Sequence, residues 1–200
     1  MKRRIVFYCF AFLFIFSSTV GAHQDPLPAQ SAKKRQWTED DRKQLLTKAQ
    51  GGDANSQNWL AAAYEQGWFG EKNFSEALKW FRKSAAKGNP DAQASLGQMY
   101  EDGEGVKQSY ALAAKWYRKA AEHVPDLGGA GQGRNNLGLL YLNGRGVPKD
   151  YVQAYMWFSL FRGNASTNLA YAKERMTEQE ILEAERRVRE WKVRHHDLQD

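Results

Sequence analysis

Three tyrosines with matching surroundings constrain the fold of this chain more than any other feature. Tyr64, Tyr100 and Tyr141, the reference tyrosines, lie 36 and 41 residues apart. Each has a leucine four residues before it, a glycine three residues after it and a tryptophan sixteen residues after it. Columns that match at such a period indicate small units that recur and stack on one another. The other repeat positions are Leu60, Gly67, Trp80, Leu96, Gly97, Gly103, Trp116, Leu137, Gly138, Gly144 and Trp157.

The columns predict two helices per repeat. Because the leucine and the tyrosine are four residues apart, they share one face of a first helix. This helix ends at the following glycine, which tolerates the left-handed conformation. Nine residues after the tyrosine stands Asn73, Ser109 or Asp150, whose side-chain oxygen can cap a second helix, and Asp53 and Asn89 can cap first helices. Asp150 and the glycines before it are therefore interpreted as joints between helices, not as a catalytic or phosphate site.

The segments Ala92 to Glu122 and Asn135 to Phe158 resemble the Sel1-like repeat family, which is akin to the tetratricopeptide repeats. The resemblance covers about Asp53 to Asn164. It implies an all-α fold, a right-handed α/α solenoid of three helix pairs with capping helices at both ends. Beyond the repeats, Thr177 and Glu180 predict a capping box for a helix that covers the last repeat.

The three copies are not identical. The first has Phe69 where the others have Gly105 and Gly146, so its loop between helices is expected to follow a different path. Five extra residues follow the second copy, and no capping side chain stands at the usual place there. Within the middle repeat, Trp116 is expected to be a core aromatic between two layers.

The N-terminus has the pattern of a secretory signal peptide. Lys2, Arg3 and Arg4 precede an apolar run from Ile5 to Phe16, and small residues follow up to Ala22. We expect cleavage after Ala22 and an exported protein, periplasmic or secreted; a retained membrane anchor is the alternative. The expected parts are a signal peptide (1–22), a flexible leader (23–36), an N-terminal capping helix (37–52), three repeats within 53–164 (53–89, 90–130 and 131–164), C-terminal capping helices (165–196) and a tail (197–200).

Cleavage would change both the cysteine content and the charge. Cys9 is the only cysteine, so the mature chain would have none and would be stabilised by packing alone. The net charge of +6 would fall to +3, because the three lost basic residues leave 26 Lys and Arg against 23 Asp and Glu. So small a charge of mixed sign gives little support to nucleic-acid binding.

Motifs that carry chemistry are few. Gly128, Gly129, Gly131 and Gly133 do not form a dinucleotide-binding pattern and are interpreted as a flexible insertion. The four histidines lack the spacing of a metal site, so neither a metal nor a cofactor is expected.

One stretch, Ser84 to Lys87, matches the S-x-x-K pattern of penicillin-recognising enzymes, and some cysteine-rich relatives in the Sel1-like family have been called β-lactamases. However, Ser84 occupies the column of Ala120 in the next repeat, and the companion S-D-N and K-T-G motifs are absent. The paired cysteines of those relatives are absent too. We therefore expect no catalytic site, with a β-lactamase-like or cell-wall-acting enzyme as the alternative.

The resemblance to tetratricopeptide repeats implies a binding surface on the concave face, formed by the first helix of each repeat. The corresponding columns are rich in amides and carboxylates and contain no lysine or arginine. We expect a monomeric, non-catalytic adaptor that binds an extended basic or neutral peptide segment of another protein. The expected partner-binding residues are Asn55, Asn58, Glu65, Gln66, Gln98, Glu101, Asp102, Asn135, Leu139 and Asn143.

Overall fold

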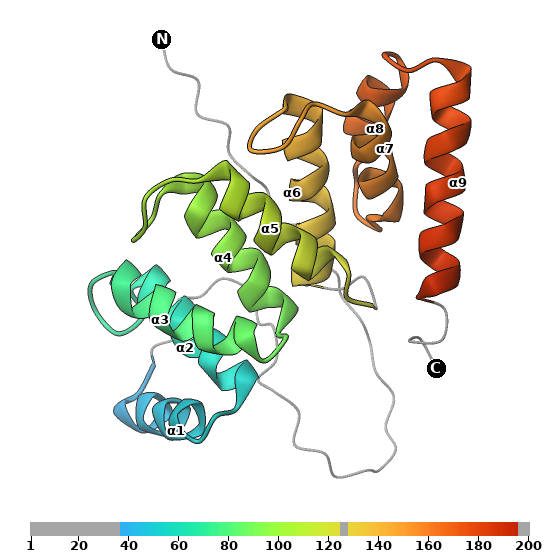
Figure 1. Ribbon diagram of the computed structural model, residues 1–200. Helices are drawn as coiled ribbons and strands as arrows, with labels where there is room; N and C mark the ends of the chain where they lie inside the picture. Colours follow the sequence, from blue (N-terminus) through green and yellow to red (C-terminus); the bar gives the residue numbers. More distant parts are fainter. Residues whose placement is uncertain (1–36, 125–127, 196–200) are drawn as a thin grey trace. The chain divides into compact units, whose positions relative to one another are not determined.

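A computed structural model describes residues 37–124 and 128–195. The predicted signal peptide and leader lie outside these residues. The described chain is helical and contains no strand, which confirms the all-α solenoid (Figure 1). Its helices are α1 (Glu39–Gln50), α2 (Ala54–Gln66), α3 (Phe74–Ala86), α4 (Pro90–Asp102), α5 (Tyr110–Ala121), α6 (Gly129–Asn143), α7 (Tyr151–Leu160), α8 (Ser166–Lys173) and α9 (Glu178–Arg194).

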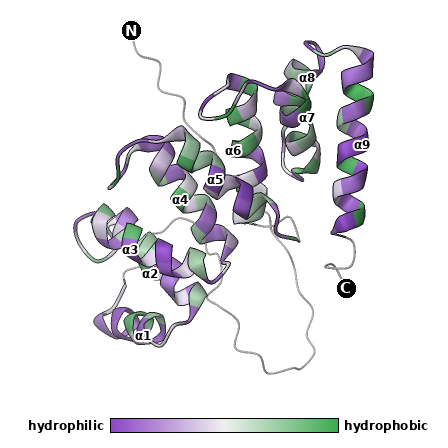
Figure 2. Cartoon of the chain, viewed as in Figure 1, coloured by the Kyte–Doolittle hydropathy of each residue, from purple (hydrophilic) through white to green (hydrophobic). Residues whose placement is uncertain are grey.

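The helices pair as the repeat predicts. The first helix of each repeat, here called the inner helix (α2, α4 or α6), packs on the outer helix that follows it (α3, α5 or α7). Each outer helix also contacts the next inner helix, and α4 contacts α6 directly. At the C-terminal end, α8 and α9 both pack on α7. Hydrophobic residues recur at intervals along α9 among a majority of hydrophilic ones, as expected of a helix that buries one face (Figure 2).

Helix ends lie where the capping residues predict them. Inner helices end at Gly67, Gly103 and Gly144, whose φ angles of 70°, 77° and 68° are left-handed. A further bond closes each loop, because the N–H of the capping residue nine positions later donates to the carbonyl of the reference tyrosine at 2.8–3.0 Å. The side chains that accept a backbone N–H at a helix N-terminus are Thr38, Asp53, Asn73, Asn89, Ser109, Asp150 and Thr177.

In the second and third repeats, a buried aromatic side chain packs against a glycine of the inner helix. A Cβ atom on Gly97 would lie 2.4 Å from the ring of Tyr117, and one on Gly138 would lie 2.7 Å from Phe158. Trp116 was expected to be a core aromatic between two layers, but the fully buried aromatic of its repeat is Tyr117. Tyr117 is fully buried, whereas Trp116 is only partly buried and packs on the edge of the first core cluster. The closest packing lies one residue further along the helix, in the column of Tyr117 and Phe158.

The loop of the first repeat differs for a clear reason. Gly105 and Gly146 let the later loops approach the preceding outer helix, where an added Cβ would come within 2.9 Å of the Phe74 carbonyl oxygen or 2.2 Å of the Tyr110 carbonyl carbon. In the first repeat this place belongs to Phe69, which packs edge-on against Trp37 with ring centroids 5.7 Å apart. An aromatic contact thus replaces a close backbone approach.

The prediction of a flexible insertion at the glycines is wrong. Gly129, Gly131 and Gly133 are buried in the first turns of α6. A Cβ on Gly129 would lie 2.2 Å from the Pro90 carbonyl oxygen, so glycine permits α6 to start against α4. No local side chain caps this helix; instead the Asp91 carboxylate accepts from the Gly129 N–H at 2.5 Å. The missing cap is supplied by the neighbouring repeat.

A polar column that the sequence pattern did not single out ties each inner helix to the outer helix before it. Seven residues before the reference tyrosines stand Gln57, Gln93 and Arg134, all buried. Their side chains donate to the carbonyls of Ala49, Ala85 and Ala121 at 2.9, 3.3 and 2.9 Å. Because these alanines lie in the last turns of α1, α3 and α5, the bonds satisfy carbonyls that a helix end leaves without a partner. By this criterion α1 occupies the place of an outer helix.

Candidate partner-binding surface

The expected binding residues lie on the inner helices, with unequal access to solvent. Asn55, Gln66, Gln98, Asp102 and Asn143 are exposed. The rest are half-buried: Asn58, Glu65, Glu101, Asn135 and Leu139. This set is called the inner surface below.

Several of its amides bond to other residues of the chain. The Asn89 amide donates to Asn55 Oδ1 at 2.9 Å, and the Gln132 amide donates to Gln98 Oε1 at 3.3 Å, so both bonds link consecutive repeats. Asn135 donates to Asn136 at 3.2 Å. Asn58 differs, because its amide oxygen is buried and has no hydrogen-bond partner among the described residues. The amides therefore both support the stack and line its surface.

Carboxylates gather where α2 and α4 end. Burial raises the pKa of Glu65, and the nearby carboxylates of Glu104 and Asp102 raise it further. Glu101 accepts a hydrogen bond from the Tyr117 hydroxyl at 2.8 Å. Burial, followed by the charge of Glu101, raises the pKa of Tyr117 and keeps it neutral. Negative side chains at helix C-termini are disfavoured by the helix dipole, so this cluster is a site where a cation would be stabilised.

An aromatic residue on the same helix face was missed by the sequence analysis. Trp59 follows Asn55 by four residues and precedes Gln66 by seven, so all three lie on one stripe of α2. Its side chain is 43% exposed. The signal was available in the repeat alignment, because the matching residues of the other repeats, Ser95 and Asn136, are polar.

The S-x-x-K residues serve the fold. Ser84 is fully buried, and its hydroxyl donates to the Ala54 carbonyl at 2.7 Å, which joins α3 to the start of α2. The Lys87 ammonium donates to the Gly52 carbonyl. Ser84 thus lies away from solvent. Within the residues that the structure describes, no group of three His, Cys, Asp or Glu side chains is arranged to hold a metal ion.

Comparison with known proteins agrees with this geometry. The Sel1 repeat model matches residues 54–89, 90–123 and 132–161, which together make half of the chain. The chain belongs to the Sel1 repeat family. No curated protein matches this Sel1 repeat protein.

Two solved structures are similar to it. One is c5321, a protective antigen present in uropathogenic Escherichia coli strains that displays an SLR fold; it is 32% identical with a TM-score of 0.68. The other is a Sel1 repeat protein from Oxalobacter formigenes, 30% identical with a TM-score of 0.54. The matches cover 80% and 67% of this chain but only 36% and 50% of those two chains.

Sel1 repeats commonly form protein–protein interaction modules, and the family is in general a non-catalytic scaffold. In the described part of this chain, no helix has the length and apolar character needed to cross a membrane.

Proposed function

We propose that this Sel1 repeat protein is an exported, non-catalytic adaptor that binds an extended basic segment of another protein along its inner surface. The observation that carries the proposal is the carboxylate cluster of Glu65, Glu101, Asp102 and Glu104 at the ends of two consecutive inner helices. Carboxylates close enough to raise a pKa repel one another, and a lysine or arginine side chain of a partner would relieve that repulsion.

The neighbouring amides support an extended ligand. Asn58, Gln98 and Asn135 stand on three successive inner helices, and an amide can both donate to and accept from a peptide backbone. Export is supported by the charged and apolar N-terminal pattern, cleaved after Ala22 in this proposal. The similar Escherichia coli protein is described as a protective antigen, which is compatible with export.

The test begins with a photo-crosslinker placed at the exposed Gln98 in living cells, followed by mass spectrometry of the captured protein and calorimetry with its crosslinked segment. Reversing both Glu101 and Asp102 to lysine should weaken binding at least tenfold, which corresponds to about 1.4 kcal/mol. The loss should shrink at high salt, because exposed charges are screened.

Glu174→Lys is the control for added positive charge. Its side chain is 72% exposed at the end of α8 and is not part of the cluster, so it adds half the positive charge of the double variant without changing the cluster. Equal affinity of the double variant and this control would reject the inner surface as the binding site. Circular dichroism of each variant confirms that the helices are intact.

A further inference from the structure

Exposed large apolar side chains mark both ends of the helix stack. At the start, Trp59 and Trp68 are 43% and 37% exposed; at the end, Leu182 and Val193 on α9 are 58% and 74% exposed. The end units of a solenoid normally present a polar outer face, which keeps the protein soluble. Apolar side chains at both ends therefore call for another explanation.

Among the described residues, which begin at Trp37, no inner helix precedes α1. Because α1 occupies the place of an outer helix, a complete repeat would need an inner helix before it. The residues 36 positions before Leu60 and Tyr64 are Gln24 and Pro28, so the sequence does not continue the repeat there. At the junction between the last two repeats, the side chain of Asn136 lies near the Tyr117 hydroxyl of the preceding repeat. Its counterpart in the first repeat is the exposed Trp59.

Three tryptophans, here called the N-terminal edge, line this end. The rings of Trp37 and Trp68 are stacked with centroids 5.5 Å apart, and those of Trp59 and Trp68 lie 6.3 Å apart. In the other repeats the positions of Trp68 are held by Glu104 and Arg145. The repeat itself therefore does not require tryptophan there, and the edge offers aromatic faces that can receive an apolar or a cationic side chain.

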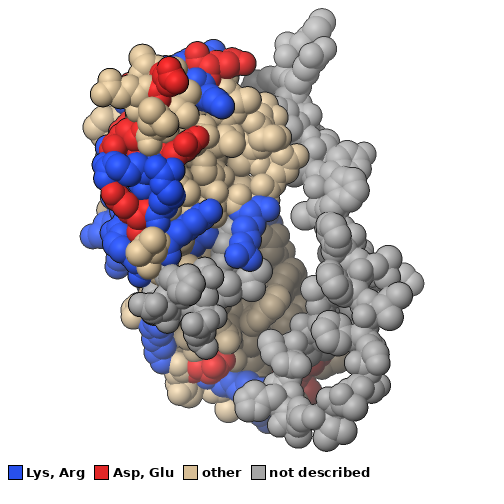
Figure 3. Space-filling model, turned by 90° about the vertical axis from the view of Figure 1, so that its right-hand side faces the viewer, with Lys and Arg blue, Asp and Glu red and all other residues tan. Residues whose placement is uncertain are grey.

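The other end presents a single helix face. Ala184 and Trp191 are buried against the repeats, which leaves Leu182, Arg186, Arg189 and Val193 on the opposite side, called the α9 outer face. These four recur at spacings of four, three and four residues, so they lie along one face of the helix. Lysine and arginine side chains gather on the side of the molecule that carries α9 (Figure 3).

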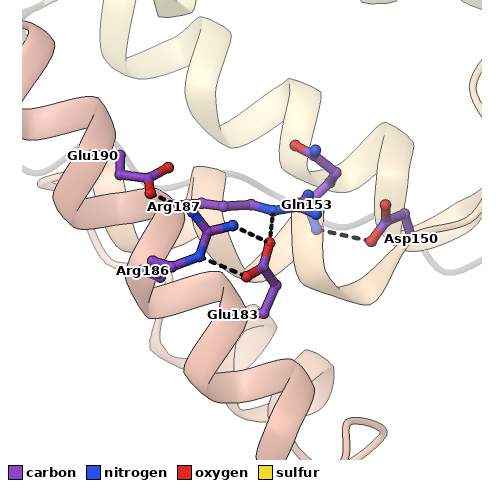
Figure 4. Close-up of polar contacts among 6 residues, drawn as sticks. All are labelled: Asp150, Gln153, Glu183, Arg186, Arg187 and Glu190. Carbon is purple, nitrogen blue, oxygen red and sulfur yellow. Dashed lines mark hydrogen bonds and ion pairs between the residues drawn. The ribbon is translucent and has the colours of Figure 1, made fainter.

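The two halves of α9 differ in charge. Arg186 is held by Glu183 and Glu190, and Arg187 also bonds to Glu183 at 2.7 Å (Figure 4). Arg189 and Arg194 make no ion pair with any residue that the structure describes. From Arg186 to Arg194 there are four arginines and one lysine against one glutamate, a net charge of +4. The first turn of α1, beside Trp37, carries Glu39, Asp40 and Asp41. Arg42 follows and lies 4.0 Å from Glu39, so residues 39–42 have a net charge of −2.

We propose that copies of this chain associate head to tail. The second half of α9 in one copy lies on the N-terminal edge of the next, in the place that a preceding inner helix would take. Val193 packs against Trp59 and Trp68, while Arg189 and Arg194 face the acidic first turn of α1. Because the two surfaces differ, each copy keeps one free end and the assembly grows into open chains.

The test uses the chain from His23 onward and measures its mass by sedimentation over a range of concentrations. The parent protein should gain mass as concentration rises, and high salt should reduce the gain. Trp59→Glu blocks one end, and Val193→Glu blocks the other. Each variant alone should stay monomeric, but an equimolar mixture should form a one-to-one dimer through its two intact ends. Leu112→Glu, which replaces an apolar residue 40% exposed in the middle of the stack, should assemble like the parent.

A parent protein that stays monomeric at every concentration would overturn the proposal. So would a mixture of the two blocked variants that forms no dimer. Loss of assembly in Leu112→Glu would also overturn it, since this would show a general response to added charge. Circular dichroism must show the parent helix content in all variants, and an Arg189→Glu variant supplies a milder block of the α9 outer face if Val193→Glu fails to fold. Trp59 shares a stripe of α2 with Asn55 and Gln66, so peptide binding is compared in the parent and in Val193→Glu, whose substitution lies on α9, and it should be equal in the two.

Discussion

Each repeat has a buried side chain, seven residues before the reference tyrosine, that donates to a carbonyl at the end of the preceding helix. The residue type differs between repeats. Gln57 and Gln93 each reach one carbonyl, whereas Arg134 donates to the carbonyls of Ala121, His123 and Leu160 at 2.9, 2.6 and 3.1 Å. The carbonyls belong to the C-terminal ends of α5 and α7, where the helix dipole favours a positive charge. The guanidinium also lies 4.5 Å from the centre of the Trp191 ring, so one residue joins four helices.

Arg134→Met should therefore be strongly destabilising. The methionine keeps most of the apolar volume but leaves three carbonyls without this donor, and an unsatisfied buried polar group costs about 1–3 kcal/mol. We expect the free energy of unfolding in urea to fall by roughly 3–5 kcal/mol. Arg118→Met is the control, since its exposed guanidinium bonds only to the Tyr141 hydroxyl and packs near its ring. A similar loss in both variants would contradict this role.

At the scale of the helix and its loop, glycine serves two distinct purposes. Gly144 and Gly146 share nearly the same left-handed φ, 68° and 69°. Only Gly146 also lies against another element, where an added Cβ would meet the Tyr110 carbonyl carbon at 2.2 Å. At Gly144 the nearest atom would be the Lys149 Cβ at 3.1 Å. Gly144 is needed for its backbone angle, whereas Gly146 is needed both for its backbone angle and for space.

Alanine substitutions should separate the two purposes. Gly144→Ala should cost about 1–2 kcal/mol, the strain of an L-residue in the left-handed region. Gly146→Ala carries the same strain and must also push the loop away from α5, so its loss should be at least roughly twice as large. Urea denaturation of the two variants measures the difference. Equal losses would mean that the loop can move away from Tyr110 without disturbing the packing.

Sequence reasoning succeeded for the elements that depend on neighbours in the chain. The caps at Asn73, Asp150 and Thr177 are local, so their residue types are enough to predict them. It failed where the partner is distant. The cap of α6 comes from Asp91, 38 residues away, and no local pattern can reveal it. Trp116 was expected in the core, yet the column that faces the small residue decides which aromatic is fully buried.

The candidate binding surface was predictable only in part. The repeat register places Asn58, Gln98 and Asn135 on successive inner helices, and the structure has them there. It could not predict that amides such as those of Gln98 and Gln132 bond to each other, because such bonds depend on the spacing between repeats. The exposure of Trp59 likewise depends on which described helices lie beside α2, which is a property of the whole stack.

In a stack of repeats, whole-molecule stability is the sum of the units and of the junctions between them. The junction between the second and third repeats contains His123, whose Nε2 lies 3.1 Å from Gln93 Oε1 and whose carbonyl accepts from Arg134. Burial lowers the pKa of His123 below its ordinary value of 6.5, and the nearby Arg134 charge lowers it further. The folded protein therefore keeps this imidazole neutral at pH values where the unfolded chain has begun to protonate it.

The sign of the pH dependence follows from this difference. Between the two pKa values the unfolded state binds more protons, so acid favours unfolding, and stability should decline as the pH falls below about 6.5. His123→Gln keeps a side-chain donor for Gln93 but cannot titrate, so its thermal midpoint should fall less between pH 7 and pH 5 than that of the parent. Comparing the two slopes removes the contribution of the other titrating groups, which the parent and the variant share. Parallel slopes would show that this junction does not sense pH. A smaller slope in the variant would make the contact between the second and third repeats the acid-sensitive point of the stack.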